Sequence, residues 1–325
     1  MKITTVNIGT LLSGASLLAC GGGLSFREQQ RLAAGSDLKK ALQKGVRLLP
    51  VAALPKNSYV VTVSEVGAAD APVMDKSGLS EALRLLEAKT HKKIVALLPG
   101  EIGQETITLD AATVAQLPVV DSDLSGCRAV PRLVDCAFVR NVKSFCMSPM
   151  VVMFADGRME FIKKQRSLQT DEKIVRAIVP DGEIVTIVGG MVSSSIVQKY
   201  LNYGSYSLAI TLGKALRARE KLQDCFPTPV LLGPTKVTVK KVQKLKLKGF
   251  NKKRVVLASA LGEIELTIQN EYMACRMGTK IFRFPQMIML LDRLGKRGLH
   301  SSEVKKGMSA ILFIADAFAF WKGNE

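Results

Sequence analysis

The stretch IVALLPGEIGQETITLDAATVAQLPVVDSD, residues 94–123, holds two short apolar runs on either side of an amphipathic segment. Residues 94–98 and 117–121 predict strands, and residues 106–115 predict the helix between them. Strands joined through a helix run parallel with a right-handed crossover. The stretch therefore predicts an α/β domain, with a mainly parallel sheet that carries helices on its faces.

The same alternation begins earlier, with a predicted strand over residues 59–63 and a predicted helix over 79–88. In such sheets, ligands bind beyond the carboxyl ends of the strands. Three predicted strand ends lead into loops with glycine and acidic side chains, and these loops are residues 65–67, 99–105 and 121–128. We therefore expect a binding site at this edge of the sheet.

A run of glycines, which we call the glycine loop, follows the first predicted helix. It comprises residues 20–23, Cys-Gly-Gly-Gly, between helices predicted over 5–18 and 26–44. Glycines at the start of a helix expose backbone N–H groups that can hold a polar ligand. They equally permit a tight corner between packed helices, so both interpretations stay open.

Beyond about residue 168 the pattern changes to short strands linked by turns. The predicted strands are residues 184–188, 236–242, 254–259, 264–268, 287–291 and 310–314. Regularly spaced strands favour a β-barrel or sandwich. One long amphipathic helix, expected over 206–222, interrupts them and is expected to dock on the first domain. We predict two domains, residues 1–168 and 169–325.

Lysine and arginine outnumber the acidic residues, 46 to 28, and the net charge is +18 over 325 residues. Much of this excess lies in residues 236–254, where lysines alternate with apolar residues and no acidic side chain occurs. Such lysines are typical of exposed strand faces, where they oppose aggregation. Nucleic-acid binding through this run is the less favoured alternative, because Phe250 alone could stack on a base.

Residues 1–21 resemble a bacterial lipoprotein signal that ends at Cys20, but polar residues interrupt their apolar stretch. No other run is long enough to span a membrane, so we expect a cytoplasmic protein. The six cysteines form no C-x-x-C pair, which disfavours a zinc site. His91 and His300 lie outside site-like sequence contexts, so carboxylates, thiols or a metal held by oxygen must carry any catalysis.

Several candidates for catalysis lie in the predicted loops. Asp121 and Asp123 are candidates for a general base, directly or through a bound divalent metal. Arg128 is expected to pair with one of them or to hold a substrate carboxylate. Cys20 is a candidate nucleophile, because a helix N-terminus lowers a thiol pKa. The structural alternatives, turn capping by Asp121 and corner packing by Cys20, stay open.

A series of short segments extends over nearly the whole chain. These are residues 19–23, 67–76, 100–105, 117–123, 126–131, 266–272, 284–288 and 307–321. In sequence and order they resemble the two domains of the S-methyl thiohydantoin desulfurase family. The resemblance implies a three-layer α/β/α sandwich followed by a β-barrel-like domain.

The same resemblance implies a hydrolase. Water would replace the sulfur of a thiohydantoin-type ring in the cleft between the domains, releasing methanethiol from the S-methylated compound and leaving a hydantoin. The residues expected at the substrate are Gly21, Gly22, Gly23, Glu101, Glu105, Arg128, Asn270 and Glu271. For Glu105, capping of a helix explains the residue equally well, and for Asn270 and Glu271 so does an ordinary polar strand end.

The chain departs from the family pattern at Cys20, Gln104, Glu105 and Gln286, where Thr, Gly, Asn and Asp are usual. These departures keep a second hypothesis open, a catalytically degenerate relative that binds a small molecule or serves as the partner subunit of a hydantoinase-type enzyme. A homo-oligomer is compatible with either. A divalent metal is the one cofactor that the expected chemistry would accommodate.

Overall fold

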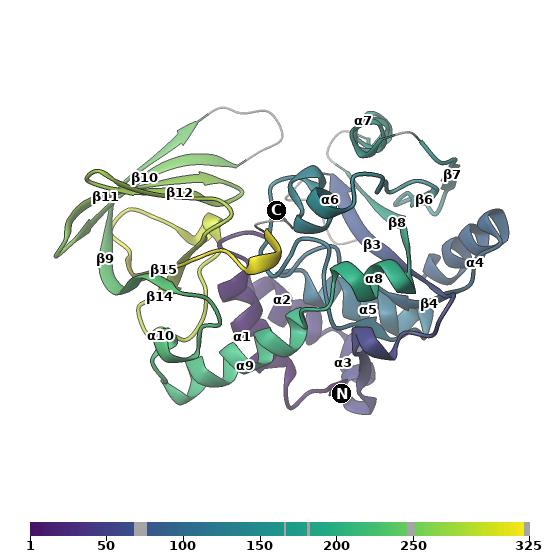
Figure 1. Ribbon diagram of the computed structural model, residues 1–325, viewed down its shortest axis with the longest axis horizontal. Helices are drawn as coiled ribbons and strands as arrows, with labels where there is room; N and C mark the ends of the chain where they lie inside the picture. The colour runs from purple at the N-terminus through teal and green to yellow at the C-terminus, as the bar shows by residue number, and fades with distance from the viewer. Residues whose placement is uncertain (68–76, 166, 181–182, 246–250, 322–325) are drawn as a thin grey trace.

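The computed structural model describes residues 1–67, 77–165, 167–180, 183–245 and 251–321. It contains two sheets, one in each of two domains (Figure 1). The motif over residues 67–76 falls, from residue 68 onward, outside this described part, as do Lys246, Lys248 and Phe250.

The first sheet has the order β1-β2-β5-β4-β3-β8-β6-β7. Its strands are β1 (Lys2–Ile3), β2 (Val46–Leu49), β3 (Tyr59–Gly67), β4 (Ile94–Leu97), β5 (Val119–Val120), β6 (Met150–Met153), β7 (Met159–Ile162) and β8 (Ile184–Ser193). Strands β2, β5, β4 and β3 are parallel, and the flanking strands join them antiparallel. The predicted parallel unit is therefore the centre of a mixed sheet.

Most of the helices surround this sheet, whereas the last one, α10, lies beside the second sheet (Figure 1). They are α1 (Ile8–Leu18), α2 (Phe26–Ala33), α3 (Ser36–Lys44), α4 (Leu79–Thr90), α5 (Glu105–Ala115), α6 (Ala137–Asn141), α7 (Leu168–Ile178), α8 (Ser194–Tyr200), α9 (Ser205–Ala218) and α10 (Leu222–Cys225). Short 3₁₀ turns cover Val51–Ala53, Leu133–Asp135, Ser301–Glu303 and Ala319–Trp321. The single helix predicted over 26–44 is wrong, because the extended backbone of Gly35 separates α2 from α3.

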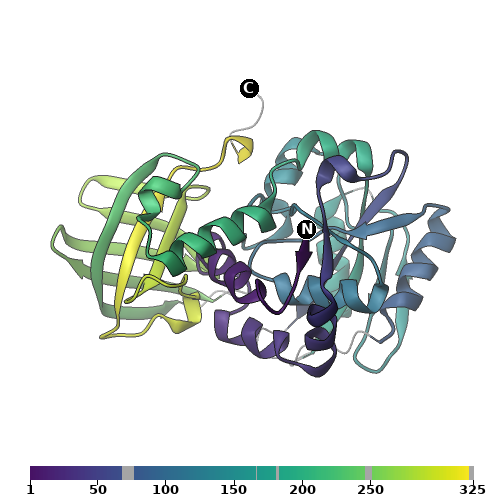
Figure 2. The same ribbon diagram turned by 90° about the horizontal axis from the view of Figure 1, so that it is seen from below.

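The second sheet is antiparallel, with the order β13-β12-β11-β10-β9-β15-β14. Its strands are β9 (Val230–Leu245), β10 (Lys252–Ser259), β11 (Gly262–Gln269), β12 (Glu271–Met277), β13 (Lys280–Arg283), β14 (Met287–Asp292) and β15 (Ser309–Ala315). It curls into a half-barrel (Figure 2), with alternate residues such as Ile264, Leu266 and Ile268 buried inside. The predicted fold class, α/β followed by a barrel-like β domain, is confirmed.

The strand predicted over 184–188 is β8, and it belongs to the first sheet, between β3 and β6, rather than to the half-barrel. The prediction was wrong because a short apolar run does not identify its partner strand. The helix expected over 206–222 is α9, which lies along α1 (Figure 2). The boundary at residue 168 stays a prediction.

The lysines of residues 236–254 follow the expected pattern with one exception. Lys236, Lys240, Lys241 and Lys244 are exposed on β9. Lys253 is 6% exposed, because it lies on the inner face of β10 together with Val255 and Leu257. Its Nζ donates to the carbonyl oxygen of Ser301 at 3.0 Å, so the expectation of an exposed Lys253 was wrong.

Helix α1, the stretch that imitates a lipoprotein signal, is buried between α9 and the segment that follows β14. Backbones approach closely here: a Cβ built on Gly14 would lie 1.8 Å from the carbonyl oxygen of Ala209 in α9, and one on Gly298 would lie 2.0 Å from that of Ser16. No described helix is both long and apolar enough to cross a membrane. The packing fixes the position of the glycine loop, which follows α1.

Candidate functional site

The glycine loop lies at the junction of the two domains. Three of its carbonyl oxygens meet donors of the second domain: the N–H of Tyr272 reaches Cys20 at 2.8 Å, that of Ser301 reaches Gly21 at 2.8 Å, and Nε2 of His300 lies 3.1 Å from Gly23. The half-barrel therefore holds the loop in place through its backbone. The glycines form the tight corner that the sequence predicts, and residues of both domains pack against it.

No side chain fits on these glycines. A Cβ on Gly21 would lie 2.7 Å from the Tyr272 ring, and one on Gly22 would lie 2.5 Å from Oε1 of Glu271. A Cβ on Gly23 would lie 2.4 Å from the carbonyl oxygen of Gly103, in the loop after β4. The glycine loop is thus enclosed between the start of β12 and the carboxyl end of the parallel strands, the edge where the sequence predicts a site.

Three carboxyl groups with perturbed pKa values surround the loop. Burial raises the pKa of Glu101 and of Glu105 to about 7, and that of Glu271 to about 8. The negative charge of Glu101 further raises the pKa of Glu271. In the same way, the negative charge of Glu105 raises the pKa of Glu101. Carboxyl groups of this kind exchange protons near neutral pH and cluster at functional sites.

Two oxygens of this carboxyl cluster, which comprises Glu101, Glu105 and Glu271, are free. Glu101 accepts hydrogen bonds from the Gln104 side chain at 2.6 Å and the Val130 N–H at 3.3 Å. Oε1 of Glu105 accepts from the Gly103 N–H at 2.6 Å. Oε2 of Glu105 and Oε2 of Glu271 are buried without a hydrogen-bond partner among the described residues. A ligand with N–H groups would supply the missing donors.

Asp121 and Asp123 are occupied by hydrogen bonds within the fold. Asp121 caps α9, accepting from the N–H groups of Tyr206 and Ser207, both at 3.0 Å, and from the Ser207 hydroxyl at 2.5 Å. Asp123 holds the following turn, since it accepts from the Ser125 hydroxyl and from the N–H groups of Gly126 and Cys127. Their predicted catalytic roles stay predictions, and these contacts give both residues a structural function.

Cys20 is buried at the C-terminal end of α1, in a left-handed conformation with φ 48°. Burial raises its thiol pKa to about 11, although the nearby Arg128 guanidinium acts in the opposite direction. The argument that a helix N-terminus lowers this pKa was therefore wrong, because Cys20 follows one helix instead of starting another. The thiol is protonated at neutral pH.

Arg128 and Asn270 bind backbone groups. Arg128 is fully buried, with hydrogen bonds to the carbonyl oxygens of Ala129, Tyr272 and Gln286 at 2.9, 2.6 and 3.4 Å. The expected ion pair of Arg128 with Asp121 or Asp123 is not formed, since both carboxylates face other donors. Asn270 is a left-handed turn residue between β11 and β12, and its Oδ1 accepts from the Asn251 N–H at 2.9 Å.

Two family models together match nearly the whole chain: the S-Me-THD-like N-terminal domain matches residues 6–164, and the S-Me-THD-like C-terminal domain matches residues 166–325. The chain belongs to the S-Me-THD-like family. The resemblance to S-methyl thiohydantoin desulfurases is thereby confirmed at the level of the family.

A crystal structure of a protein from Chromobacterium violaceum has the same fold as this S-Me-THD-like chain. The two superpose with a TM-score of 0.78 at 19% sequence identity, over 99% of this chain and 94% of that one. No curated protein matches the sequence.

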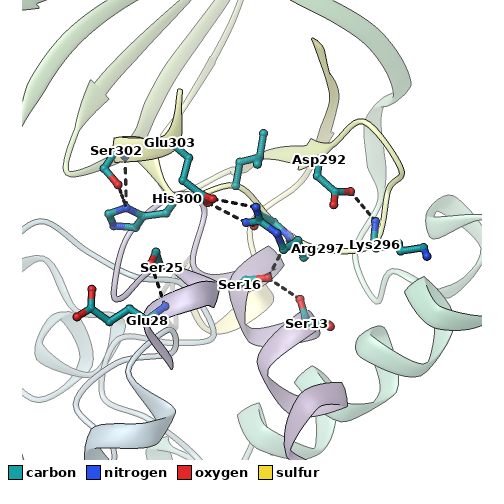
Figure 3. A network of polar contacts seen from close by, with 12 residues as sticks. Ser13, Ser16, Ser25, Glu28, Asp292, Lys296, Arg297, His300, Ser302 and Glu303 are labelled. Atoms are coloured by element: carbon teal, nitrogen blue, oxygen red, sulfur yellow. Dashed lines mark hydrogen bonds and ion pairs between the residues drawn. The ribbon is translucent and has the colours of Figure 1, made fainter. Parts of the chain in front are cut away.

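His300 lies beside the glycine loop, although its sequence context does not indicate a site. It lies on a polar network between the segment after β14 and helices α1 and α2 (Figure 3). Its Nδ1 accepts from the Ser302 N–H at 3.3 Å, so Nε2 carries the proton and donates to Gly23. Burial lowers its pKa. No sequence signal could reveal this contact, because 277 positions separate the two residues.

The same network joins the S-Me-THD-like domains directly. Arg297 forms a bidentate ion pair with Glu303, both distances 2.8 Å, and the Gly298 N–H donates to Oγ of Ser16 in α1 at 3.0 Å (Figure 3). These bonds hold the segment that carries His300 against the glycine loop. Among the described residues, no group of three or more His, Cys, Asp or Glu side chains is arranged to hold a metal.

The carboxyl cluster predicts how stability depends on pH. Its three members keep their protons in the folded state up to about pH 7 or 8, whereas the unfolded chain releases them near pH 4.5. The free energy of unfolding should therefore fall as pH rises through this interval, by about 1.4 kcal/mol per pH unit for each group that differs. His300, with its lowered pKa, acts in the opposite direction below its ordinary value of 6.5.

Urea denaturation at several pH values between 5 and 8 measures this dependence. Glu105→Gln should reduce the slope, since it removes one of the three carboxyl groups, while Glu263→Gln on the exposed end of β11 should leave it unchanged. A wild-type stability that rises steadily over the interval would contradict the protonated state of the cluster.

Proposed function

We propose that this protein hydrolyses the C–S bond of a thiohydantoin-type ring at the glycine loop. The observation that carries the proposal is the carboxyl cluster beside the loop, with pKa values near neutrality and two unpartnered oxygens. A cyclic amide offers N–H groups to such oxygens. The S-Me-THD-like family supplies the class of ring.

The pKa values divide the catalytic roles. Glu271, protonated at neutral pH because its pKa is about 8, donates a proton to the leaving methanethiolate. Glu101, half-buried with a pKa of about 7, accepts a proton from the attacking water. The water oxygen bonds to the ring carbon as the C–S bond breaks, and the second water proton moves to the ring nitrogen of the former C=N bond, which yields methanethiol and a ring carbonyl beside an N–H group. Return of the proton held by Glu101 to the ionised Glu271 restores both carboxyl groups. Water is the nucleophile, because the Cys20 thiol is protonated.

Methanethiol release tests the proposal. Purified protein incubated with S-methylated thiohydantoins should release thiol, detected with a thiol reagent, at a rate proportional to protein concentration. The assay should be run with a chelator and with added divalent metals, so that any metal requirement is measured directly. No thiol release under either condition, from rings with several side chains, would contradict hydrolysis.

A second candidate is a ligand-binding protein without turnover, and the residues that depart from the family pattern favour it. Gln104 donates to Glu101 at 2.6 Å, and the Gln286 side chain accepts from the Arg283 N–H at 2.8 Å. Both amides thus serve the fold of this chain. Binding of a hydantoin without thiol release from the matching thiohydantoin would support this candidate over the enzyme.

A further inference from the structure

An open pocket lies on the outside of the half-barrel, and none of its residues belongs to the glycine loop or the carboxyl cluster. Its volume is about 460 Å³, and residues of β10, β9 and β15 line it together with Arg293, which follows β14. Volumes of this size are typical of sites for small molecules. The proposed hydrolysis makes no use of this pocket, so a ligand bound here would be distinct from the substrate.

Short side chains form the floor of the pocket. On adjacent strands, Thr238 pairs with Ala258 on one side and with Ser309 on the other. Their chain neighbours Val237 and Ala310 are buried in the core of the half-barrel, and successive residues of a strand point to opposite faces. The row of Ala258, Thr238 and Ser309 therefore lies on the outer face, where its short side chains leave the space above the strands open.

Two cationic side chains border this row. Lys236 lies two residues before Thr238 on β9, and Arg293 directly follows the last residue of β14. Both line the pocket, both are exposed, and neither side chain forms a hydrogen bond or ion pair with another described residue. The hydroxyl groups of Thr238 and Ser309 are likewise without a partner in the described part of the chain. Four side chains that can donate hydrogen bonds are thus available to one ligand.

The acidic side chains nearest to the pocket do not pair with these cations. None of the described residues that line the pocket is acidic. Asp292, next to Arg293, accepts from the Lys296 N–H at 2.8 Å. Glu263 on β11 pairs with Ala258 and so lies beyond the row, on the side opposite to β14. The pocket therefore presents positive charge together with neutral donors.

We infer that this pocket binds the phosphate group of a small, soluble phosphate ester. An arginine guanidinium can hold two phosphate oxygens at once, and a lysine ammonium adds a second point charge. Together Arg293 and Lys236 match the charge of a phosphate monoester, about −1.5 to −2 at neutral pH. A carboxylate carries one negative charge and would leave one of the two cations unmatched. The pocket is wider than a phosphate group, so the organic part of the ester can lie beside Ile311.

The net charge of +18 attracts every anion, so the test must separate a site from the overall field. A double variant, Lys236→Gln with Arg293→Gln, removes the two cations of the pocket. The control, Lys241→Gln with Lys296→Gln, removes two exposed cations from β9 and the segment after β14 that do not line the pocket. Both variants lower the net charge by the same amount and change only exposed side chains.

Calorimetric titration with inorganic phosphate and with glycerol 3-phosphate, at about 0.15 M chloride to screen the long-range field, measures the affinity. The wild-type protein and the control variant should bind both ligands alike. The pocket variant should bind them about tenfold more weakly or worse, the effect of losing a hydrogen bond to a charged group. Acetate should bind the wild-type protein more weakly than phosphate does.

Several results would overturn the inference. These are an equal loss of affinity in both double variants, binding of acetate as tightly as phosphate, and no binding of either phosphate compound by the wild-type protein. Attachment to vesicles that contain phosphatidic acid, without binding of glycerol 3-phosphate, would also overturn it. Amide NMR signals of Thr238 and Ser309 in the wild-type protein should shift with phosphate, which tests the site without any variant. None of these outcomes depends on thiol release, so the proposed hydrolysis stands or fails separately.

Discussion

Replacing Gly14 by alanine should lower the free energy of unfolding by about 3 kcal/mol, the upper range for a buried overpacked site. The new Cβ would lie 1.8 Å from the carbonyl oxygen of Ala209, a backbone atom of α9. The packing is equally close in the other direction: a Cβ on Gly213, in α9, would lie 1.9 Å from the carbonyl oxygen of Thr10 in α1. Because the clashing atoms are backbone atoms, no side-chain rotation can relieve the overlap. Helices α1 and α9 would have to separate, and the glycine loop would shift with α1.

Gly9→Ala is the matched control, because it makes the same substitution in the same helix. A Cβ on Gly9 would lie 2.8 Å from Nη2 of Arg217, the mobile end of a long side chain. Alanine gains about 1 kcal/mol over glycine in a helix interior, so this variant should be as stable as the wild type or more so. Denaturant unfolding of both variants measures the difference, and equal stabilities would contradict the close packing of α1 on α9.

The sequence predicts those elements whose signals are local. The strand over 94–98 and the helix over 106–115 were identified because apolar periodicity and element length lie within one short window. The half-barrel strands with Ile264, Leu266 and Ile268 were identified for the same reason. Strand β12 was not predicted, because it does not alternate between buried and exposed residues. Its pairing with β11 shifts register near Ile268, and the adjacent residues Glu271 and Tyr272 are both buried.

For the candidate site too, the sequence predicts the residues in the loops but not their long-range contacts. Glu101, Glu105 and Glu271 were expected at the substrate; in the structure Glu271 lies against Gly22, and Glu101 and Glu105 flank Gly103, which packs on Gly23. The hydrogen bonds of Asp121 to α9 could not be predicted from the sequence, because that helix begins more than eighty positions later. His300 was beyond it too, since its contact with Gly23 depends on how the two domains pack. Residue type and loop position therefore indicate a site, while hydrogen-bond partners decide which members are free to act.

The carboxylates that the fold uses and those that it leaves free differ in their donors. Asp121 and Asp123 together accept from six donors of this chain, so a ligand would compete with the fold for them. Oε2 of Glu271 has no hydrogen-bond donor among the described residues, and the Glu271 side chain lies against Gly22 of the glycine loop. A group that is costly to bury and unpaired in the fold is more readily explained by a role in function than by one in stability.

Glu271→Gln should reduce kcat for thiol release by about 10²–10⁴-fold, the range for loss of a general acid. Glutamine has nearly the same shape as glutamate but cannot give a proton to the leaving thiolate, so KM should change far less than kcat. The same variant should be more stable than the wild type above pH 8, where the wild-type carboxyl loses its proton while buried. Below about pH 4 the two proteins should be equally stable, because the side chain at this position is then neutral in the folded and the unfolded states of both.

Steady-state kinetics at neutral pH and denaturant unfolding at pH 4 and pH 9 measure the two effects on one protein preparation. A purely structural Glu271 would give the opposite pair of results, with lower stability and activity lost only in proportion to unfolded protein. Unchanged kcat in a folded variant would remove Glu271 from the mechanism and transfer the acid role to Glu105, the other member of the carboxyl cluster with an unpartnered oxygen. Glu263→Gln, exposed on β11, should alter neither kcat nor stability, because its side chain is solvated at every pH.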